Sequence, residues 1–338
     1  MIGAHIELSG CTILLAAAPG TSDRAARYLQ AQYVDTLLQA STPLGAAALL
    51  GQADVLALCS GQSLQFSTLR EQALAQGIPV IVLDSGAQGG RISLVGGGPG
   101  ALDLLTLRAA AVLASADVVF CDRLGPGEFL DRLAPQARII DVGKQPGHHK
   151  VTQDRIEERM LQEALRGHHV VRLKGGDPYV FGRGFEELRT ATAAGIPVSV
   201  VPGLSSCITV PAAAGIPVTA RGVTRAFTVI SGHDPLEEHQ LRQLAGLGGT
   251  IVVLMGMGTL EHTAAGLRRC GLAADTPCAV IESGTTGTQR TTHATLSTLA
   301  AASRAAGCAN PAVIVIGQVA ALPLALDAMP PLSLGATA

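Results

Sequence analysis

Short hydrophobic runs alternate with amphipathic stretches along most of this chain. Each run beyond residue 90 leads into a glycine, acidic or prolyl turn, and stretches of helical spacing such as 154–166 and 184–194 separate them. The last apolar residues of these runs are Val95, Cys121, Val142, Leu173, Val201, Leu254 and Ile281. Alternation of this kind indicates βα units, and therefore an α/β fold in which ligands bind beyond the carboxyl ends of the strands.

The first 88 residues show the same alternation on a smaller scale. Strand-like runs and helical stretches follow one another at 11–17, 22–32, 54–59, 67–76 and 78–83. The pattern predicts a separate, small α/β domain of the Rossmann type. A polar, glycine-rich linker at 85–90 joins it to the rest of the chain.

A glycine-rich turn at 95–100 can be interpreted as a dinucleotide-binding loop. Gly96, Gly98 and Ala101 satisfy G-x-G-x-x-G/A. Asp122 lies about 20 residues further on, where a dinucleotide fold places the acid that binds the ribose. On this pattern alone the chain is a nicotinamide or flavin enzyme.

Pro99 favours a different interpretation of the same turn. A dinucleotide loop opens its helix within the glycines, so that free N–H groups meet the pyrophosphate. Pro99 has no N–H, and Gly100 disfavours a helix directly after it. We therefore expect the helix to begin later, with Asp103 as its N-cap before the periodic run that starts at Leu104.

Eight motifs in a fixed order carry a resemblance to a known family. They are VGGGPG (95–100), CDRL (121–124), VGKQPGHH (142–149), VVRLKGGDPYVFGRG (170–184), VPGLSS (201–206), AGIPVT (214–219), VLMGM (253–257) and IESGTTGTQR (281–290). Over about residues 91–320 the chain resembles the uroporphyrinogen-III C-methyltransferases, S-adenosylmethionine-dependent enzymes that make precorrin-2. The resemblance implies two α/β sub-domains of the tetrapyrrole methylase type with the active site in the cleft between them.

The expected domain boundaries follow from this resemblance. Residues 91–203 and 204–325 are the two methyltransferase sub-domains, divided near a prolyl turn, and 326–338 is a tail. Residues 1–88 resemble a degenerate precorrin-2 dehydrogenase module. The glycines that such a module needs for close approach to pyrophosphate are alanines at 16–18, so we expect no dinucleotide to bind there.

Two residues fall on the family's proposed proton-transfer positions. Asp122 corresponds to the proton acceptor of the family's YDRL motif, with Cys121 in place of Tyr, and Lys144 corresponds to the proton donor. The chain has only three lysines, Lys144, Lys150 and Lys174, against many arginines, which makes a lysine at a motif position informative. The alternatives are an Asp that caps a turn and a solvated loop lysine.

The resemblance also implies the binding residues. Its S-adenosylmethionine contacts correspond to Pro99, Gly175, Gly176, Asp177, Val180, Ser205, Ser206, Met255 and Gly284. The family's Thr-Ala pair is Ser-Ser at 205–206, and its T-H-R-D stretch is T-A-R-G at 219–222, which affects contacts to the tetrapyrrole. Because the tetrapyrrole carries many carboxylates, nearby arginines are expected to pair with it, and the candidates are Arg123, Arg172, Arg183 and Arg221.

Composition excludes several other classes. With 3% aromatic residues, no Trp and a net charge of −2, the chain lacks the stacking platforms and basic surface of a nucleic-acid binder. No apolar stretch is long enough to predict a membrane span. Seven scattered cysteines indicate free thiols in a reducing cytosol, and the adjacent histidine pairs at 148–149 and 168–169 lack metal-ligand spacing. We expect a cytoplasmic enzyme without metal, which the resemblance implies is a homodimer.

Three alternatives remain open. The altered 219–222 stretch is compatible with a related methyltransferase that acts on a later precorrin. Residues 11–30 or 91–122 could serve a nicotinamide oxidoreductase. A non-catalytic cofactor-binding or scaffold protein would be indicated if Asp122 or Lys144 proved dispensable.

Overall fold

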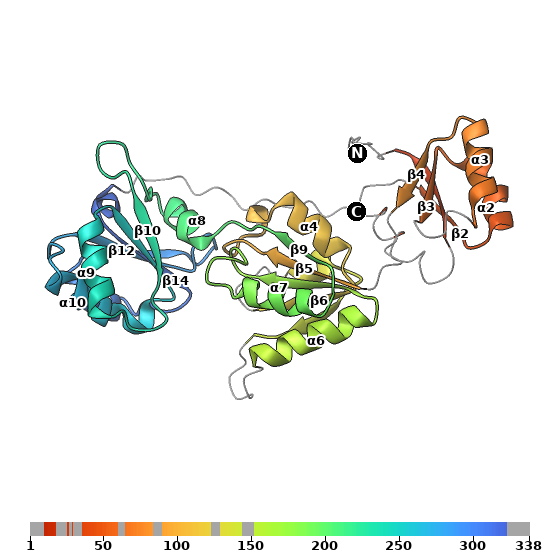
Figure 1. The fold of residues 1–338 in the computed structure, drawn as a ribbon. Coiled ribbons are helices and arrows are strands. Elements are labelled where there is room, and N and C mark those ends of the chain that lie inside the picture. The colour runs from red at the N-terminus through yellow and green to blue at the C-terminus, as the bar shows by residue number, and fades with distance from the viewer. Residues whose placement is uncertain are drawn as a thin grey trace.

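The chain folds around three β-sheets that follow one another along the sequence (Figure 1). The computed structural model describes residues 10–17, 36–59, 65–83, 90–122, 129–143 and 152–322, together with Ala26 and Leu29. All three parts combine a sheet with covering helices, so the predicted α/β class is confirmed. None of the described helices is both long and apolar enough to cross a membrane.

The N-terminal sheet is parallel throughout, with strand order β2-β1-β3-β4. Its strands are β1 (Thr12–Ala16), β2 (Thr36–Ala40), β3 (Val55–Cys59) and β4 (Val80–Leu83), and its helices are α2 (Pro43–Leu49), η1 (Leu50–Gln52) and α3 (Ser67–Ala75). The predicted strands and the helix at 67–76 are confirmed, whereas the stretch at 22–32 lies almost wholly outside the described residues. The half-exposed strand β2 and the helix α2 were not predicted.

The second sheet is also parallel, with the order β7-β6-β8-β5-β9. Its strands are β5 (Arg91–Gly96), β6 (Val118–Cys121), β7 (Arg138–Asp141), β8 (His169–Lys174) and β9 (Val198–Val201). Two layers of helices cover it: α4 (Leu107–Ala114) and α5 (Leu130–Leu133) on one face, and α6 (Gln153–Leu165) and α7 (Gly184–Ala193) on the other. Figure 1 shows α4 on the opposite side of the sheet from α6 and α7. Burial on both faces explains why β5, β6 and most of β8 are nearly continuous apolar runs, whereas the edge strands β7 and β9 are partly exposed.

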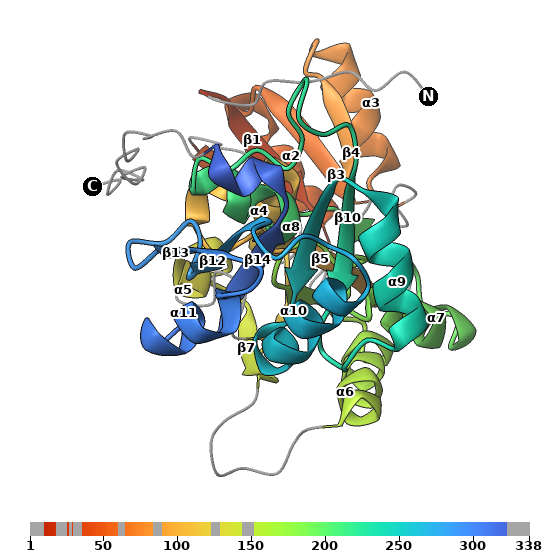
Figure 2. The same ribbon diagram turned by 90° about the vertical axis from the view of Figure 1, so that its left-hand side faces the viewer.

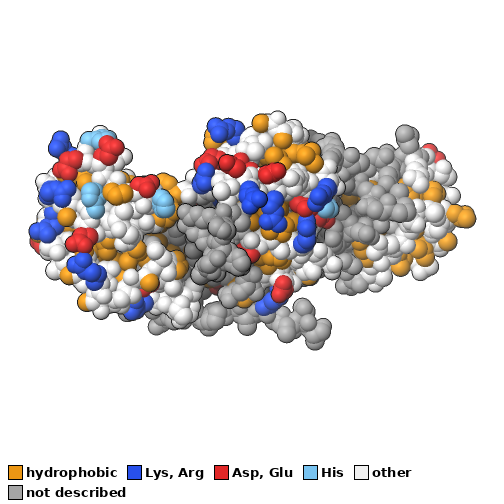
Figure 3. All heavy atoms as spheres, turned by 90° about the horizontal axis from the view of Figure 1, so that it is seen from below, with side chains coloured by type: hydrophobic (Ala, Val, Ile, Leu, Met, Phe, Trp, Pro, Cys, Tyr) orange, Lys and Arg blue, Asp and Glu red, His pale blue; other side chains and the backbone are white. Residues whose placement is uncertain are grey.

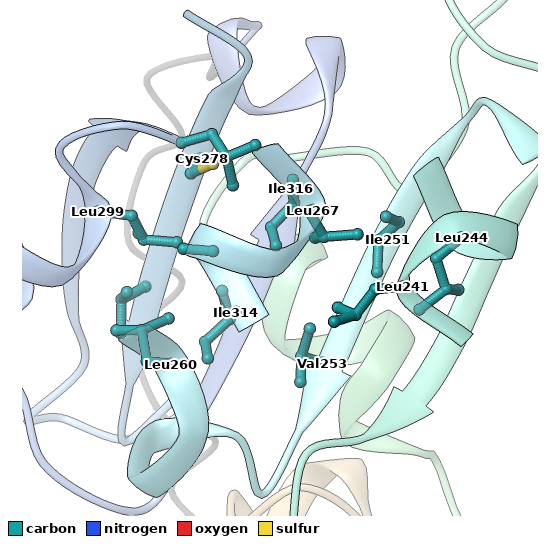
Figure 4. Packing of buried hydrophobic residues seen from close by; sticks show 13 residues of the cluster. Leu241, Leu244, Ile251, Val253, Leu260, Leu267, Cys278, Leu299, Ile314 and Ile316 are labelled. Carbon is teal, nitrogen blue, oxygen red and sulfur yellow. The ribbon is translucent and has the colours of Figure 1, made fainter. Parts of the chain in front are cut away.

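The third sheet is mixed, with the order β10-β11-β14-β12-β13. Its strands are β10 (Phe227–Ser231), β11 (Thr250–Leu254), β12 (Pro277–Glu282), β13 (Arg290–Thr295) and β14 (Ala312–Ile316), and only β10 and β11 pair in parallel. Its helices are α8 (Ser206–Ala213), α9 (Glu238–Leu247), η4 (Met257–Thr259), α10 (Leu260–Arg269), α11 (Leu299–Ala305) and η5 (Gln318–Ala321). Figure 2 shows α9, α10 and α11 together over one face, and Figure 4 shows the apolar cluster beneath them.

The start of α4 corrects one prediction. Asp103 lies in the short 3₁₀ turn η2 (Leu102–Leu104) and does not cap α4. The helix begins at Leu107, and the side chain of Thr106 accepts a hydrogen bond from the N–H of Ala109 at 3.1 Å. The glycine turn is therefore separated from the helix by more residues than expected, because Leu105 adopts an extended conformation.

This correction predicts a difference between two substitutions. Thr106→Ala removes the cap and should lower the free energy of unfolding by about 1 kcal/mol. Asp103→Ala is the matched control and should change it by less than about 0.5 kcal/mol, as is usual for a surface substitution. Urea denaturation of both variants measures this, and a larger loss for Asp103→Ala would mean that the helix begins at the earlier position.

Candidate functional site

The register of the second sheet brings four motifs to one edge. Val95 pairs with both Leu173 and Val201, and Cys121 also pairs with Leu173. The four strands therefore end at nearly the same level, and the loops that follow them leave the sheet side by side. These loops contain the glycine turn, Asp122, the G-G-D segment and the V-P-G-L-S-S segment, so the carboxyl edge of this sheet is the candidate site.

Three glycine backbones cross at this edge. A Cβ on Gly203 would lie 2.2 Å from the carbonyl oxygen of Gly176, and a Cβ on Gly96 would lie 2.4 Å from the nitrogen of Gly203. Real Cβ atoms do not approach other atoms so closely, so positions 96 and 203 require glycine, whereas Gly176 has room for a Cβ and is favoured as glycine by its φ of 66°. The glycines thus let three loops pack directly on one another, in addition to any close approach to a ligand.

Two backbone N–H groups of the glycine turn donate hydrogen bonds to the end of β8 and to the loop that follows it. The N–H of Gly97 donates to the carbonyl of Lys174 at 2.7 Å. Gly98 and Gly176 exchange two backbone hydrogen bonds, of 3.2 and 2.7 Å. With Pro99 adding no N–H, this turn does not present the row of free amides that a pyrophosphate site uses.

The carboxylate of Asp177 accepts hydrogen bonds from its own loop and from the turn after β9. Its Oδ1 accepts from the N–H of Tyr179 at 2.8 Å and its Oδ2 accepts from the N–H of Gly203 at 3.0 Å. Each carboxylate oxygen has a second lone pair, so a polar group of a ligand can still bind to Asp177. The residue therefore has a structural role beside the predicted contact to the cofactor.

A second edge is formed by the third sheet. β11 and β12 both run antiparallel to β14, and Leu254 and Ile281 both pair with Val313. Met255 and the segment from Ser283 onward therefore leave this sheet at the same edge. Gly284 packs against α8, since a Cβ there would lie 2.4 Å from Cγ1 of Val210.

An ion pair between Glu282 and Arg290 connects the two residues that flank the segment 283–289. Arg290 donates to both carboxylate oxygens of Glu282 at 2.9 Å, and the N–H of Ala309 also donates to Glu282 at 2.9 Å. The Arg290 guanidinium lowers the pKa of the buried Glu282 carboxyl to about 2. The pair fixes the place where β12 ends and the segment begins.

The two edges meet each other. The N–H of Ala101, next to the glycine turn, donates to Thr285 Oγ1 at 3.3 Å. A Cβ on Gly100 would lie 3.3 Å from Cγ2 of Thr286. Val180, from the loop after β8, packs against the apolar cluster between the third sheet and α8. Segments that are far apart in sequence thus form one continuous region.

Unusual backbone conformations are concentrated in this region. Among the described residues, five that are not glycine have a positive φ: Phe181 (54°), Arg183 (59°), Met255 (57°), Ser283 (46°) and Thr285 (68°). All five lie in the loops after β8, β11 and β12. Residues other than glycine rarely adopt this backbone conformation because it is strained. Such strain is concentrated at functional sites, where the surrounding structure enforces it.

The structure brings most of the predicted cofactor residues together. Gly176 and Asp177 contact the turn that leads to Ser205 and Ser206: a Cβ on Gly176 would lie 3.9 Å from Cα of Ser205, and the N–H of Gly203 donates to Asp177. Gly175 directly precedes them in the same loop. Pro99 lies in the paired glycine turn, and Gly284 approaches that turn from the other edge. Met255 is 43% exposed at the second edge.

The predicted proton-transfer residues are only partly described. Asp122 follows β6 at the first edge, with 28% of its side chain exposed. Lys144 and Arg123 lie outside the described residues. Cys121, which replaces the family's tyrosine, is buried, and burial together with the Asp141 and Asp122 carboxylates raises the pKa of its thiol, so the thiol stays neutral.

The predicted substrate arginines lie in different environments. Arg183 is exposed and pairs with Glu186, donating from Nε at 3.0 Å. Arg221 is exposed in the loop 219–225, which lines a cavity of about 840 Å³. Arg172 is only 4% exposed and its Nε donates to Glu187 at 3.1 Å, which argues against direct pairing with a substrate.

Sequence reasoning missed the buried partners of Arg172. Lys174 and Glu187 lie beside it, with 4% and 1% of their surfaces exposed. The available signal was two cations at alternate positions, R-x-K at 172–174, within an otherwise apolar strand. Alternate residues of a strand share a face, and on a buried face such cations require an anionic partner.

Comparisons with known proteins define the family. Residues 91–300 match the tetrapyrrole (corrin/porphyrin) methylases. The S-adenosyl-L-methionine-dependent uroporphyrinogen III methyltransferase of Methanosarcina barkeri is 47% identical over 234 residues, which cover 68% of this chain and 92% of that protein. The chain belongs to the tetrapyrrole methylase family.

Two further proteins show how far the similarity extends. The siroheme synthase of Gluconobacter oxydans is 40% identical over 71% of this chain, but the match spans only 51% of that longer protein. The crystal structure of the uroporphyrin-III C-methyl transferase of Thermus thermophilus, complexed with S-adenosyl homocysteine, aligns with a TM-score of 0.57 and 39% identity. It covers 68% of this chain and 98% of that one.

The glycine crossing predicts a strong position dependence. Gly203→Ala forces apart the backbones at Gly176 and Gly96 and should lower the free energy of unfolding by about 1–3 kcal/mol, the range for an overpacked site. Gly246→Ala in α9 is the control, since no atom lies within 4 Å of its Cβ position, and it should stabilise the helix by roughly 0.5–1 kcal/mol. Equal effects in urea denaturation would contradict the crossing.

The ion pair at Glu282 predicts a pH dependence of stability. Because folding lowers the pKa of this carboxyl from 4.5 to about 2, its contribution is present above pH 4.5 and is lost as the pH falls toward 2. The urea midpoint of the parent chain should therefore fall more steeply over this interval than that of Glu282→Gln. Parallel curves for the two proteins would show that the pair adds nothing to stability.

Proposed function

We propose that this chain transfers methyl groups from S-adenosylmethionine to C2 and C7 of uroporphyrinogen III, which gives precorrin-2. The observation that carries the proposal is the convergence of the family's cofactor motifs at two facing sheet edges. The names of the relatives from Methanosarcina and Thermus support the same reaction. The product is a precursor of sirohaem and of cobalamin-type corrinoids.

The residues at the two edges fit the proposed cofactor. Two residues would contact it from the second edge, Met255 and Gly284. The residues that would contact it from the first edge are Pro99, Gly175, Gly176, Asp177, Val180, Ser205 and Ser206. S-adenosylmethionine supplies a methyl group on a sulfonium, which a carbon nucleophile attacks in line. The thioether of Met255 is an exposed soft contact at this place, and the serine hydroxyls and Asp177 provide polar contacts.

The protein's contribution to such a transfer is mainly positioning. Holding two reactants in line contributes up to roughly 7–11 kcal/mol in favourable cases. A pyrrole carbon that gains a methyl leaves positive charge on its neighbour, and a proton must then depart. Asp122, partly exposed at the first edge, is the proposed acceptor of that proton, and Lys144 is the proposed donor.

Arginines are the proposed contacts to the substrate. Arg183 and Arg221 are exposed and can pair with carboxylates of the tetrapyrrole, and Arg123 is a further candidate that follows Asp122 directly. The resemblance supports a cytoplasmic homodimer. We also propose sub-domain boundaries at 91–203 and 204–325, which separate the second sheet from the third.

The altered 219–222 stretch favours one other candidate, a methyltransferase for a later precorrin. A direct assay separates the two functions. Purified protein is mixed with S-adenosylmethionine and uroporphyrinogen III, and the products are identified by mass spectrometry. A doubly methylated product supports the proposal. Absence of product with uroporphyrinogen III, but methylation of a later precorrin, would overturn it.

Substitution of Asp122 tests its role in proton transfer. Asp122→Asn keeps the shape of the side chain but removes its charge, so cofactor affinity should hold while kcat falls by roughly 10²–10⁴. Steady-state kinetics and calorimetry with S-adenosylhomocysteine measure the two effects separately. An unchanged kcat would reduce Asp122 to a residue of the turn.

Removal of the N-terminal domain tests its proposed degeneracy. A chain that starts at Gly89 retains every motif of the methylase region and should keep its methyltransferase activity. The full chain should form no sirohydrochlorin from precorrin-2 and NAD, because alanines occupy 16–18. Loss of activity in a folded truncation, or NAD-dependent oxidation by the full chain, would give this domain a catalytic role.

A further inference from the structure

Two cations are buried on the face of the second sheet that α6 and α7 cover. Residues 170, 172 and 174 of β8 share this face, where Val170 belongs to the apolar cluster under the helices. Arg172 and Lys174 are each 4% exposed. Figure 3 shows this side of the molecule, where the visible acidic and basic side chains lie intermixed on the surface.

Glu187 of α7 is the anion between the two cations. Its Oε1 accepts from Nε of Arg172 at 3.1 Å and from Nζ of Lys174 at 3.1 Å. Gln153 of α6 donates to the same oxygen at 3.0 Å. Both covering helices thus help to hold the charge that balances the buried cations.

The guanidinium of Arg172 is fixed on several sides. Its Nε binds Glu187, and its Nη1 donates to the carbonyls of Leu173 at 2.8 Å and Phe120 at 3.4 Å. Its Nη2 lies 3.4 Å from Oδ2 of Asp122. The side chain therefore runs from the buried interior to the carboxylate at the sheet edge.

Packing alone does not require this arrangement. Removing charges from water costs several kcal/mol for each ion, and a buried ion pair can often be replaced by hydrophobic residues without loss of stability. Burial and the neighbouring Arg172 lower the pKa of Lys174, which Glu187 opposes. Most neighbouring residues on this face of the sheet are apolar. We therefore expect the buried charges of Arg172, Lys174 and Glu187 to have a role other than stabilising the fold.

We propose that Arg172 is a positioning residue that orients the Asp122 carboxylate, and that Glu187 in turn orients Arg172. The inference rests on the proposed role of Asp122 as proton acceptor. A planar guanidinium held by a carboxylate and two carbonyls presents Nη2 in a fixed direction, so the carboxylate is aimed before the substrate binds.

Two matched substitutions separate positioning from stability. Arg172→Met and Lys174→Met each remove one buried cation and leave Glu187 with the other one. Both should lower the melting temperature to a similar degree. Arg172→Met should also lower kcat by at least about tenfold, with KM and the affinity for S-adenosylhomocysteine unchanged, because it releases Asp122. Lys174→Met should lower kcat less. Equal losses of kcat would overturn the proposal.

A double-mutant cycle then tests whether Arg172 acts through Asp122. On the Asp122→Asn background, Arg172→Met should lower kcat by less than about twofold further, since the group that it positions is already inactive. Effects that multiply would overturn the proposal. Arg172→Lys keeps the positive charge but loses the planar guanidinium with its several N–H donors, so it should recover only part of kcat. This variant answers the same question if Arg172→Met does not fold.

The single substitution Asp122→Asn distinguishes the two ways in which the inference can fail. If Asp122→Asn leaves kcat unchanged, the proposed role of Asp122 is wrong and the inference falls with it. If Asp122→Asn lowers kcat strongly but Arg172→Met does not, the proposed function stands and Arg172 is only part of the core.

Discussion

The site depends on the crossing of three backbones, which is possible only because positions 96 and 203 are glycines. Gly96 ends β5, while Gly176 and Gly203 follow the neighbouring strands β8 and β9, and the three pack within van der Waals contact of one another. The hydrogen bonds between Gly98 and Gly176, and the hydrogen bond that the N–H of Gly203 donates to Asp177, link the loops around this crossing. The polar residues that follow, at 177 and 205–206, are placed by backbone packing before any ligand binds.

A second constraint is the meeting of two sheets of different topology. The parallel sheet ends its strands at one edge, and the mixed sheet directs β11 and β12 so that their loops also share an edge. The strained residues lie where these loops turn toward one another. Such strain persists only when well-packed elements hold it, and the apolar clusters beneath both edges provide that support.

Much of this architecture could be predicted from the sequence. The predicted ends of β5, β6, β7, β8, β9, β11 and β12 are correct to within a residue. Most of these strands are buried and therefore form nearly continuous apolar runs, whereas the edge strands β7 and β9 are short apolar runs that are partly exposed. β2, β10 and β13 were missed because their side chains are half exposed and several are polar. β14 was also missed, although it is a buried apolar run. The start of α4 was misplaced because Asp103 and Thr106 are both good caps, and only the extended Leu105 decides between them.

The candidate site was predictable in its parts but not in its connections. Motifs at strand ends implied that Asp122 and the G-G-D segment would lie together, which the register confirms. Residue type alone could not show that Arg172 is buried, since arginine is usually exposed. Nor could it show that the glycines contact each other. A glycine motif indicates that another group approaches the backbone closely, but it does not indicate whether that group is a ligand or another loop.

The most direct test of this account is a crystal structure of the chain with S-adenosylhomocysteine. We predict that the ligand lies between the two edges, in contact with Gly175–Asp177 on one side and with Met255 and Gly284 on the other. A ligand that touches only one edge, or that binds to the N-terminal domain, would contradict the account.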